Sequence, residues 1–354
     1  LTKSLDGSFL ADSVILETCG WSWSSTDAVQ LCGTTTQDNP APEPLPESDI
    51  EICKWKNCKA GAVSVSVDDG LTSCMQKLES NGFRGTYFLS GTENYSQALW
   101  NTFRSAYIRG NELAAHTRTH WCIELPESQF ISEVENNVRD IVRNTGITRS
   151  KIITFGYPCG FSTERMQEIL RTNINWKFLS SRGYNYNQLE DSAPENFFDL
   201  KSFNSKGYPG GDLEPDNYFD IVGQAEQQEK WANLIFHVEC NDDGVIDSLP
   251  SRNIWVDTIG NVVKYIKLRE NAEILNLVKT SNEIRFTIKT PTEFKQSQYA
   301  QDLTLRVIVP STQINFVTIN NLPVKYSSQQ IGDEIVVTFN VKFPIDDLVR
   351  IRFN

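Results

Sequence analysis

The chain has 354 residues, of which 39% are hydrophobic, and it carries a formal net charge of −12 at pH 7. This acidic balance argues against nucleic acid or an anionic membrane as a partner, because binding phosphates needs an excess of Lys and Arg on some face. No run approaches the ~20 apolar residues of a membrane-spanning helix, so we expect no membrane span. The length favours a catalytic core with a smaller appended module, and we expect a monomer.

Residues 1–60 show little hydrophobic periodicity and contain a Pro-rich stretch at 39–46. We expect this segment to be an N-terminal extension that packs on the following core. It holds four of the eight cysteines of the chain, namely Cys19, Cys32, Cys53 and Cys58. An even number of cysteines is typical of disulfides in an oxidising compartment, and no second close pair of cysteines exists beside Cys53 and Cys58 to complete a zinc-thiolate site. The chain begins without a charged and apolar leader, as expected for a secreted or periplasmic protein whose signal peptide has been removed.

Residues 61–277 alternate between strand and helix patterns. Period-two or short apolar runs predict strands at 62–67, 86–89, 112–115, 151–155, 176–180 and 234–236. Helical stripes fill the intervals, at 73–81, 98–110, 130–146 and 261–277. Strands that alternate with helices predict parallel pairing with crossover helices, and six or so such units are enough for a barrel.

Residues 278–354 contain only strand-like segments, among them 283–289, 303–309 and 334–342. The change of pattern predicts a C-terminal all-β module, with a sandwich as the expected architecture.

Two of the three histidines of the chain stand four residues apart, as His116 and His120. On a helix this spacing puts both imidazoles on one side of a turn, where they can bind one ion. Two solvent-facing histidines on a helix give the same pattern, so the spacing alone does not identify a metal site.

Asp68-Asp69-Gly70 follows the first strand of the predicted barrel. Asp-Gly is also a common turn pair. However, the C-terminal ends of barrel strands form the active face, and adjacent carboxylates there are costly unless a positive charge lies between them. A dication would remove that cost, and His116, which also ends a strand, can reach the same face.

The third histidine, His237, ends the apolar run 233–236. A histidine at a strand end is often only a packed, hydrogen-bonded residue. The expected position of His237 on the active face favours a functional role.

As a set, Asp68-Asp69-Gly70, His116 to His120, the loop at Pro158 and His237 resemble the polysaccharide deacetylase superfamily, carbohydrate esterase family 4, also called NodB-homology proteins. The resemblance extends from residue 61 to about residue 275 and implies a distorted (β/α) barrel of about seven strands. The segment 255–266 further resembles the end of the domain in a bacterial subgroup that carries an extra β-domain. The chain most resembles the secreted cell-wall deacetylases of predatory bacteria.

The resemblance implies a role for each of these residues. Asp68 would be the general base, His237 the general acid, and Asp69, His116 and His120 the ligands of one divalent ion, zinc first. Two histidines and one aspartate leave open positions on an ion, as a catalytic site requires. Asp68, which is not a ligand, remains free to accept a proton from water.

The family has an Arg-x-Pro-x-Gly loop, which reads Gly156-Tyr157-Pro158-Cys159-Gly160 in this chain. By resemblance, the backbone N–H of Tyr157 would stabilise the oxyanion, while Pro158 and Gly160 shape the turn. The family arginine, which pairs with the base, is missing. Its role would fall to the ion itself, to Arg118 or to Arg182.

Cys159 and Cys240 both lie near this chemistry, and a disulfide between them would tie two loops of the active face together. Cys74 and Cys122 would form a second bridge of this kind, although the sequence leaves the connectivity open. The expected reaction is removal of acetyl groups from N-acetylglucosamine units of a polysaccharide, peptidoglycan first. Chitin oligomers, acetylxylan or non-catalytic glycan binding are the alternatives.

Overall fold

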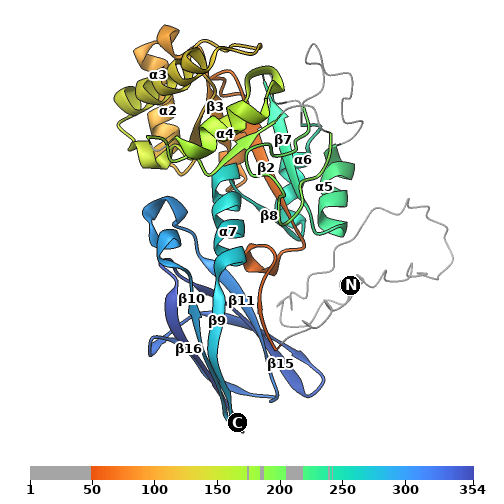
Figure 1. Cartoon of the computed structure of the whole chain (residues 1–354). Helices are drawn as coiled ribbons and strands as arrows, with labels where there is room; N and C mark the ends of the chain where they lie inside the picture. The colour runs from red at the N-terminus through yellow and green to blue at the C-terminus, as the bar shows by residue number, and fades with distance from the viewer. Residues whose placement is uncertain (1–48, 174, 184–186, 205–217, 238–239, 241) are drawn as a thin grey trace, which may run out of the picture. The chain divides into compact units, whose positions relative to one another are not determined.

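The computed structural model describes residues 49–173, 175–183, 187–204, 218–237, 240 and 242–354. These residues belong to one compact unit that begins at Pro46. Of the extension expected over residues 1–60, residues 1–48, with Cys19 and Cys32, lie outside the described part of the chain. Figure 1 shows a part in which strands and helices alternate and a part made of strands.

The first part is a parallel sheet in the order β6-β5-β4-β3-β2-β7, with β8 paired to the first half of β2. Single parallel bridges join Arg182 to Leu200 and Phe203 to Leu234, so the segment 200–203 connects β6 to β7 and completes the ring. The predicted distorted barrel of about seven strands is therefore confirmed. Its strands are β2 (Gly61–Val67), β3 (Thr86–Leu89), β4 (Glu112–Ala115), β5 (Thr154–Gly156), β6 (Ser180–Arg182), β7 (Trp231–Phe236) and β8 (Ile254–Val256).

Helices connect the barrel strands and bury one apolar stripe each. The α-helices are α1 (Met75–Ser80), α2 (Gln97–Ile108), α3 (Glu127–Thr145), α4 (Glu164–Thr172), α5 (Tyr218–Gln227), α6 (Val245–Ser248) and α7 (Ile259–Asn271). Short 3₁₀ helices are η1 (Lys56–Cys58), η2 (Thr92–Asn94), η3 (Arg149–Lys151), η4 (Pro158–Gly160), η5 (Leu249–Ser251), η6 (Thr292–Lys295) and η7 (Ser297–Tyr299). None of the helices in the described part is long and apolar enough to cross a membrane.

The central strand β2 is buried along its whole length. Its valines pack into the barrel core, as the alternating sequence predicts. The two serines between them are also buried, and each hydroxyl donates to a backbone carbonyl: Ser64 to Asp257 at 2.8 Å and Ser66 to Leu234 at 3.3 Å. A strand whose polar groups are satisfied in this way can be covered on both faces.

The candidate site residues gather at the C-terminal ends of the barrel strands. Asp68 follows β2, His116 follows β4 and Tyr157 follows β5, while Arg182 ends β6 and His237 follows β7. Parallel strands end at the same rim, so the fold brings five distant segments of the chain together there.

The second part is a sandwich of two antiparallel sheets with a shared apolar core, which confirms the predicted all-β module. One sheet has the order β1-β11-β15-β14 and the other β13-β12-β16-β10-β9. The strands are β1 (Ile50–Ile52), β9 (Glu273–Lys279), β10 (Glu283–Lys289), β11 (Leu303–Val309), β12 (Ile314–Ile319), β13 (Leu322–Pro323), β14 (Tyr326–Ile331), β15 (Glu334–Val341) and β16 (Asp346–Phe353). The module therefore takes β1 from before the barrel.

Two predicted elements differ from the structure. The helix expected over 261–277 ends at Asn271, and β9 begins at Glu273. Antiparallel pairing of β9 with β10 overrides the helical pattern of this segment. The strand expected at 176–180 is shifted, because Trp176 and Phe178 fill the barrel core from an irregular connection and only Ser180–Arg182 pairs with β5.

Candidate active site

Asp68 and Asp69 stand at a sharp turn after β2. The N–H of Asp68 still donates to Phe236 at 3.0 Å, which continues the pairing of β2 with β7. The backbone then reverses through positive φ angles of 59° at Asp69 and 68° at Gly70. A Cβ on Gly70 would lie 1.5 Å from the hydroxyl of Tyr95, so the turn requires glycine. As a result the two adjacent carboxylates face different partners.

Asp68 forms a buried ion pair with Arg182. The Nη2 atom of Arg182 donates to both carboxylate oxygens of Asp68, at 2.8 and 2.7 Å. The guanidinium also lies 4.6 Å from the ring centre of Phe88, and its Nη1 donates to Gly183 at 3.1 Å. Arg182, one of the residues considered as a substitute for the missing family arginine, thus neutralises and orients this carboxylate.

The position of Arg182 explains why Gly156 can replace the family arginine. Gly156 and Arg182 are direct partners in the β5–β6 register. A Cβ on Gly156 would lie 3.2 Å from Nη2 of Arg182 and 2.8 Å from the ring of Phe88. The arginine therefore comes from the neighbouring strand and occupies space that a side chain at position 156 would need.

The segment from His116 to His120 is a loop. The helical turn expected there is wrong, because positive φ angles of 55° at Thr117 and 60° at His120 break it. Helix α3 holds the loop instead. Glu133 accepts from the N–H groups of Arg118 and Thr119 at 3.0 and 2.9 Å.

Two further side chains of α3 continue this support. The side-chain oxygen of Asn137 accepts from the N–H of His116 at 3.0 Å, and its amide donates to Leu89 at 2.8 Å. Asp140 accepts from Nε of Arg118 at 2.8 Å. These α3 residues were not among the predicted site residues. Their signal was a polar stripe at 133, 137 and 140, beside the apolar stripe that predicted the helix.

The tautomer of His116 follows from its hydrogen bond. Its Nδ1 lies 2.8 Å from the carbonyl oxygen of Gly156, which can only accept, so Nδ1 carries a proton. In the neutral ring, Nε2 then carries a lone pair and no proton. This atom lies 3.6 Å from Oδ1 of Asp69 and 3.8 Å from Oδ2 of Asp68. A lone pair that faces two carboxylates suits a cation between them.

Asp69, His116 and His120 converge as a ligand set, with one ligand atom from each within 4.8 Å of the others. Oδ1 of Asp69 lies 3.0 Å from Nε2 of His120. It is buried, and no group of the described chain donates a well-aligned hydrogen bond to it. Burial acts to raise the pKa of Asp69, but the two histidines outweigh this effect and hold it well below its usual range. The set of two imidazoles and a carboxylate fits zinc or a similar divalent ion.

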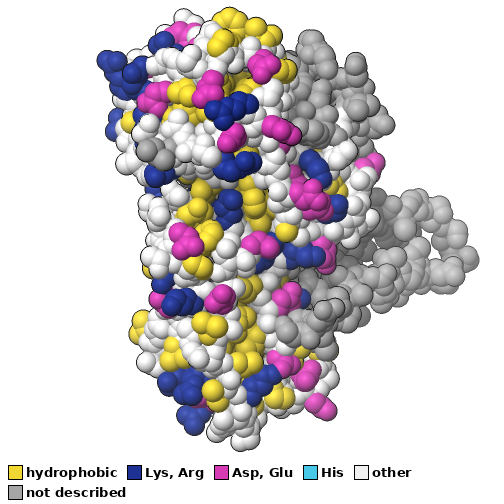
Figure 2. Space-filling model, viewed as in Figure 1, with side chains coloured by type: hydrophobic (Ala, Val, Ile, Leu, Met, Phe, Trp, Pro, Cys, Tyr) yellow, Lys and Arg dark blue, Asp and Glu magenta, His cyan; other side chains and the backbone are white. Residues whose placement is uncertain are grey.

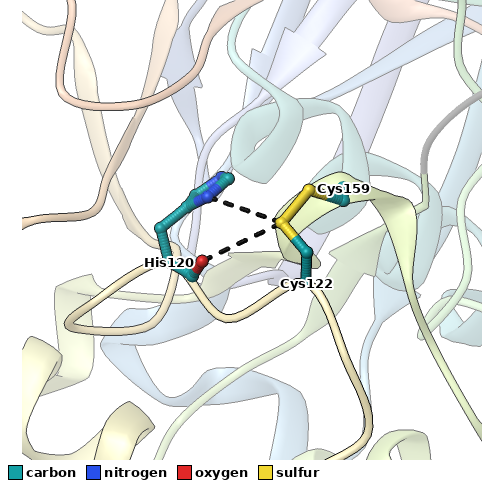
Figure 3. A group of neighbouring side chains, drawn as sticks. All are labelled: His120, Cys122 and Cys159. Atoms are coloured by element: carbon teal, nitrogen blue, oxygen red, sulfur yellow. Dashed lines mark hydrogen bonds between the residues drawn. A yellow bond between two sulfur atoms is a disulfide. The ribbon is translucent and has the colours of Figure 1, made fainter. Parts of the chain in front are cut away.

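His120 also borders a disulfide between Cys122 and Cys159. Figure 3 shows the sulfur of Cys122 next to the imidazole, 3.7 Å from Nδ1 of His120. The structure pairs Cys122 with Cys159 and Cys74 with Cys240. The expected Cys159–Cys240 and Cys74–Cys122 bridges are therefore wrong. Both observed bridges still connect loops at the active rim. The expected pairs were wrong because the loops that approach each other there differ from those assumed.

His237 lies on the other side of Asp68, with its Nε2 3.9 Å from Oδ2 of that residue. The hydroxyl of Ser73 donates to the backbone carbonyl of His237 at 2.7 Å. Burial lowers the pKa of His237, although the negative charges of Asp68 and Asp69 act to raise it. The structure thus brings both expected proton-transfer residues within reach of one small region.

Asp242, which follows in the chain, is buried. It accepts a hydrogen bond from the N–H of Ile246 at 2.8 Å and pairs with Lys77 at 2.7 Å.

The loop after β5 is anchored through Tyr157. The N–H of Tyr157 donates to the carbonyl of Arg182 at 3.2 Å and its hydroxyl to Phe198 at 3.0 Å. In this structure the Tyr157 N–H thus takes part in the β5–β6 pairing, and its expected role as the oxyanion donor stays a prediction. Pro158 is buried and Gly160 has a φ of 66°, and its N–H returns to the carbonyl of Tyr157 at 2.9 Å, so both residues form a tight turn.

Comparison with known families finds a match where the fold and the site predict one. A family model described as polysaccharide deacetylase matches residues 56–173, which include Asp68, Asp69, His116 and His120. The match ends before Arg182 and His237. No curated protein matches the sequence.

Several solved structures are distantly similar. A carbohydrate esterase domain of a multidomain xylanase, from the hindgut metagenome of Trinervitermes trinervoides, is 15% identical, with 57% of this chain and 89% of that chain covered and a TM-score of 0.40. A peptidoglycan deacetylase of Bacillus subtilis is 15% identical, with coverages of 59% and 93% and a TM-score of 0.41. A pseudoenzyme of carbohydrate esterase family 4 from Bacillus anthracis is 14% identical, with coverages of 57% and 65% and a TM-score of 0.41.

Proposed function

We propose that the chain is a metal-dependent N-deacetylase, on the premise that its residues 56–173 match a family model described as polysaccharide deacetylase. The proposed reaction is hydrolysis of the acetamide of N-acetylglucosamine units in a β-1,4-linked glycan, with peptidoglycan as the first candidate. The observation that carries the proposal is the convergence of Asp69, His116 and His120 beside the buried Asp68–Arg182 pair.

The proposed roles follow from the distances. Asp69 and the Nε2 atoms of His116 and His120 would hold one divalent ion, which supplies a Lewis acid for the acetyl carbonyl and makes a water more nucleophilic. Asp68 would accept the proton of that water. Its carboxylate is held by Arg182 and lies 3.8 Å from Nε2 of His116, next to the ligand set but outside it. Removing a water proton raises the reactivity of the attacking oxygen.

His237 would donate a proton to the departing amine. Its imidazole is 3.9 Å from Asp68, so an acetamide that lies against both side chains would have the base and the acid within reach at the same time. An amine is a poor leaving group until it is protonated, and a histidine is suited to supply that proton near neutral pH.

The test measures bound metal and acetate release on peptidoglycan, chitin oligomers and acetylated xylan. We expect Asp69→Ala and His116→Ala to lose the ion and the activity. Asp68→Asn should keep the ion and lose about 10²- to 10⁴-fold in rate, the range for a missing general base. Asp220→Asn, on the exposed surface of α5, is the matched control and should change neither quantity. Full metal retention in both ligand variants would refute the ligand set. Loss of the ion in Asp68→Asn would exchange the roles of the two aspartates.

We also propose that the protein works outside the cytoplasm. The described chain contains three disulfides, Cys53–Cys58, Cys74–Cys240 and Cys122–Cys159, and such bonds persist in oxidising compartments. Non-reducing peptide mapping of the native protein should recover all three, and free thiols at these positions would count against the location.

A further inference from the structure

The outer face of one sandwich sheet carries a row of arginines. In the β10–β16 ladder Arg285 stands directly opposite Arg350, and Arg352 follows two residues later on the same face. Residues between them, such as Phe286 and Ile351, are buried against the other sheet, which leaves the arginines on the outside. We call Arg285, Arg350 and Arg352 the arginine row.

No acidic group of the described chain pairs with this row. Among the ion pairs and hydrogen bonds of the described residues, none involves the guanidinium of any of the three arginines, and Nε of Arg350 is buried without a partner. The nearest carboxylate in the register is Glu283, opposite Arg352. Like charges placed directly opposite each other on adjacent strands are destabilising. In a protein with a net charge of −12, an uncompensated Arg285–Arg350 pair points to a ligand that supplies the negative charge.

Apolar side chains surround the arginine row. Phe316 on β12 is the register partner of Arg352 and is 39% exposed, while Val278 on β9 is the partner of Arg285 and is also 39% exposed. Leu275 extends this surface along β9. In Figure 2, Lys and Arg side chains gather with hydrophobic ones at the end of the module where β16 ends and β10 begins in Figure 1.

We propose that this face of the sandwich binds a polysaccharide that carries carboxylate groups. Arginine binds carboxylates through paired N–H donors, and the flat faces of sugar rings pack well on aromatic and aliphatic side chains. A row that crosses neighbouring strands matches the repeated charges of a polymer. Residues 56–173 match a polysaccharide deacetylase model, and the net charge of −12 of the whole chain disfavours nucleic acid. The module would hold an acidic glycan independently of hydrolysis at the barrel.

The experiment measures binding of the full chain to oligogalacturonate by titration calorimetry, with chitohexaose as the neutral glycan and a DNA duplex as a non-glycan polyanion. We expect oligogalacturonate to bind and to weaken as salt is raised. Arg285→Gln and Arg350→Gln should each weaken it about tenfold, the effect of one lost charge-assisted contact. Lys342→Gln makes the same charge change at an exposed site after β15 and should bind as the parent does.

Two further readouts separate binding from folding and from catalysis. Because Arg285→Gln and Arg350→Gln remove a like-charge pair, neither should lower the unfolding temperature. Acetate release from chitohexaose should not change in either variant. Absence of oligogalacturonate binding, equal weakening by Lys342→Gln, or equal affinity for the DNA duplex would overturn the proposal, whether or not the barrel proves to be a deacetylase.

Discussion

Asp68 and Arg182 form an ion pair with side chains only 4% and 0% exposed. Burying such a pair costs desolvation energy that its mutual attraction roughly offsets, so the pair as a whole adds little to stability. Removing one member is different, because the remaining charge stays buried without a partner. The arginine is therefore required by the presence of the aspartate.

We predict that Arg182→Gln lowers the free energy of unfolding by about 3–5 kcal/mol, the cost of an uncompensated buried charge. It should also abolish most acetate release, because the carboxylate of Asp68 loses its fixed orientation. Arg165→Gln, which breaks an exposed pair with Glu127, should leave both quantities unchanged. Urea unfolding and an acetate assay measure the two effects. Equal stability of the two variants would contradict the account of the pair.

The β5–β6 register suggests a rescue of that variant. Since Gly156 and Arg182 are register partners, and a Cβ on Gly156 would lie 3.2 Å from Nη2 of Arg182, we expect an arginine placed at either position to reach Asp68. Arg182→Gly combined with Gly156→Arg should recover part of the lost stability, provided that the ring of Phe88 moves. Arg182→Gly combined with Gly156→Ala is the control and should recover none.

The buried position of His237 makes a pH prediction. Burial lowers its pKa below the ordinary value of 6.5, so the proposed acid loses its proton at a lower pH than an exposed histidine would. The alkaline limb of kcat on an amide substrate should therefore lie below that of an ordinary histidine. His237→Asn should remove this limb and cost about two to four decades in rate, whereas an activated ester, which needs no proton, should suffer less.

The lowered pKa of His237 also predicts how the stability of the fold changes with pH. As pH falls below 6.5, the unfolded state binds this proton before the folded state does, so the folded state loses stability. The free-energy difference between the parent and His237→Asn should change in that pH window and stay flat above it.

In the kinetic test of His237→Asn, an equal rate loss on the amide and on the activated ester would exclude His237 as the acid.

At the scale of elements, helix α3 has two stripes of side chains with different roles. Its apolar stripe packs in the barrel core, and its polar stripe holds the loop 116–120, which carries two of the proposed metal ligands. Asn137 joins the two functions, because it is fully buried and bonds both His116 and the end of β3. Asn136 is its neighbour in sequence, but its side-chain hydrogen-bond partners, Ser132 and Arg139, both lie on the same helix. The two asparagines make a matched pair for testing the support of the loop.

We predict that Asn137→Ala costs about 2–4 kcal/mol of unfolding free energy, because it leaves a buried N–H and a buried C=O without partners. It should also weaken metal binding about 10- to 100-fold, as loss of a group that orients a ligand does. Asn136→Ala should change stability by no more than about 0.5 kcal/mol. Chemical unfolding and zinc titration check the pair, and equal metal affinity in both variants would show that the loop holds His116 without this support.

Sequence patterns predicted those elements whose periodicity matched their environment. The strand at 112–115 and the stripe of α3 were correct because each buries its apolar residues in the expected rhythm. The end of α7 was missed because the segment 273–277 fits a helix locally and becomes a strand only through β10. The histidine spacing suggested a helix for a similar reason, since the supports that hold the loop come from α3.

The site was predicted less completely than the fold. Residues next to a strand end could be recognised by position, as with Asp68, His116 and His237. Arg182 could only be named as one of two arginines, beside the ion itself, that could replace the missing family arginine. Its pairing with Asp68 depends on the register of β5 and β6. The disulfides depended on which rim loops meet, which no local pattern contains.

At the scale of the molecule, the sandwich uses strands from both sides of the barrel sequence. β1 pairs with β11 through three residue pairs, and Ile50 is buried in the shared core. The indole of Trp55 donates to Glu229 at 3.1 Å, and the hydroxyl of Tyr265 donates to Cys53 at 2.7 Å, so the same segment also contacts barrel elements. Residues 50–58 therefore link the two parts.

We predict that a chain that starts at Ala60 is less stable than one that starts at Asp49, because only the longer chain keeps β1 and the Cys53–Cys58 bridge. The shorter chain should also expose the edge of β11, and an exposed edge strand favours aggregation. Unfolding temperature and light scattering compare the two. Equal stability and equal solubility would show that β1 is dispensable for the sandwich.

The pairing of β1 also has a consequence for biosynthesis. A ribosome produces β1 before the barrel and its partner β11 after it, so this short apolar strand must wait while the whole barrel is translated. β16, in the other sheet, ends at Phe353 of the 354 residues. The sandwich can therefore close only once β16 has been translated, and until then the nascent chain carries a barrel with an unfinished partner.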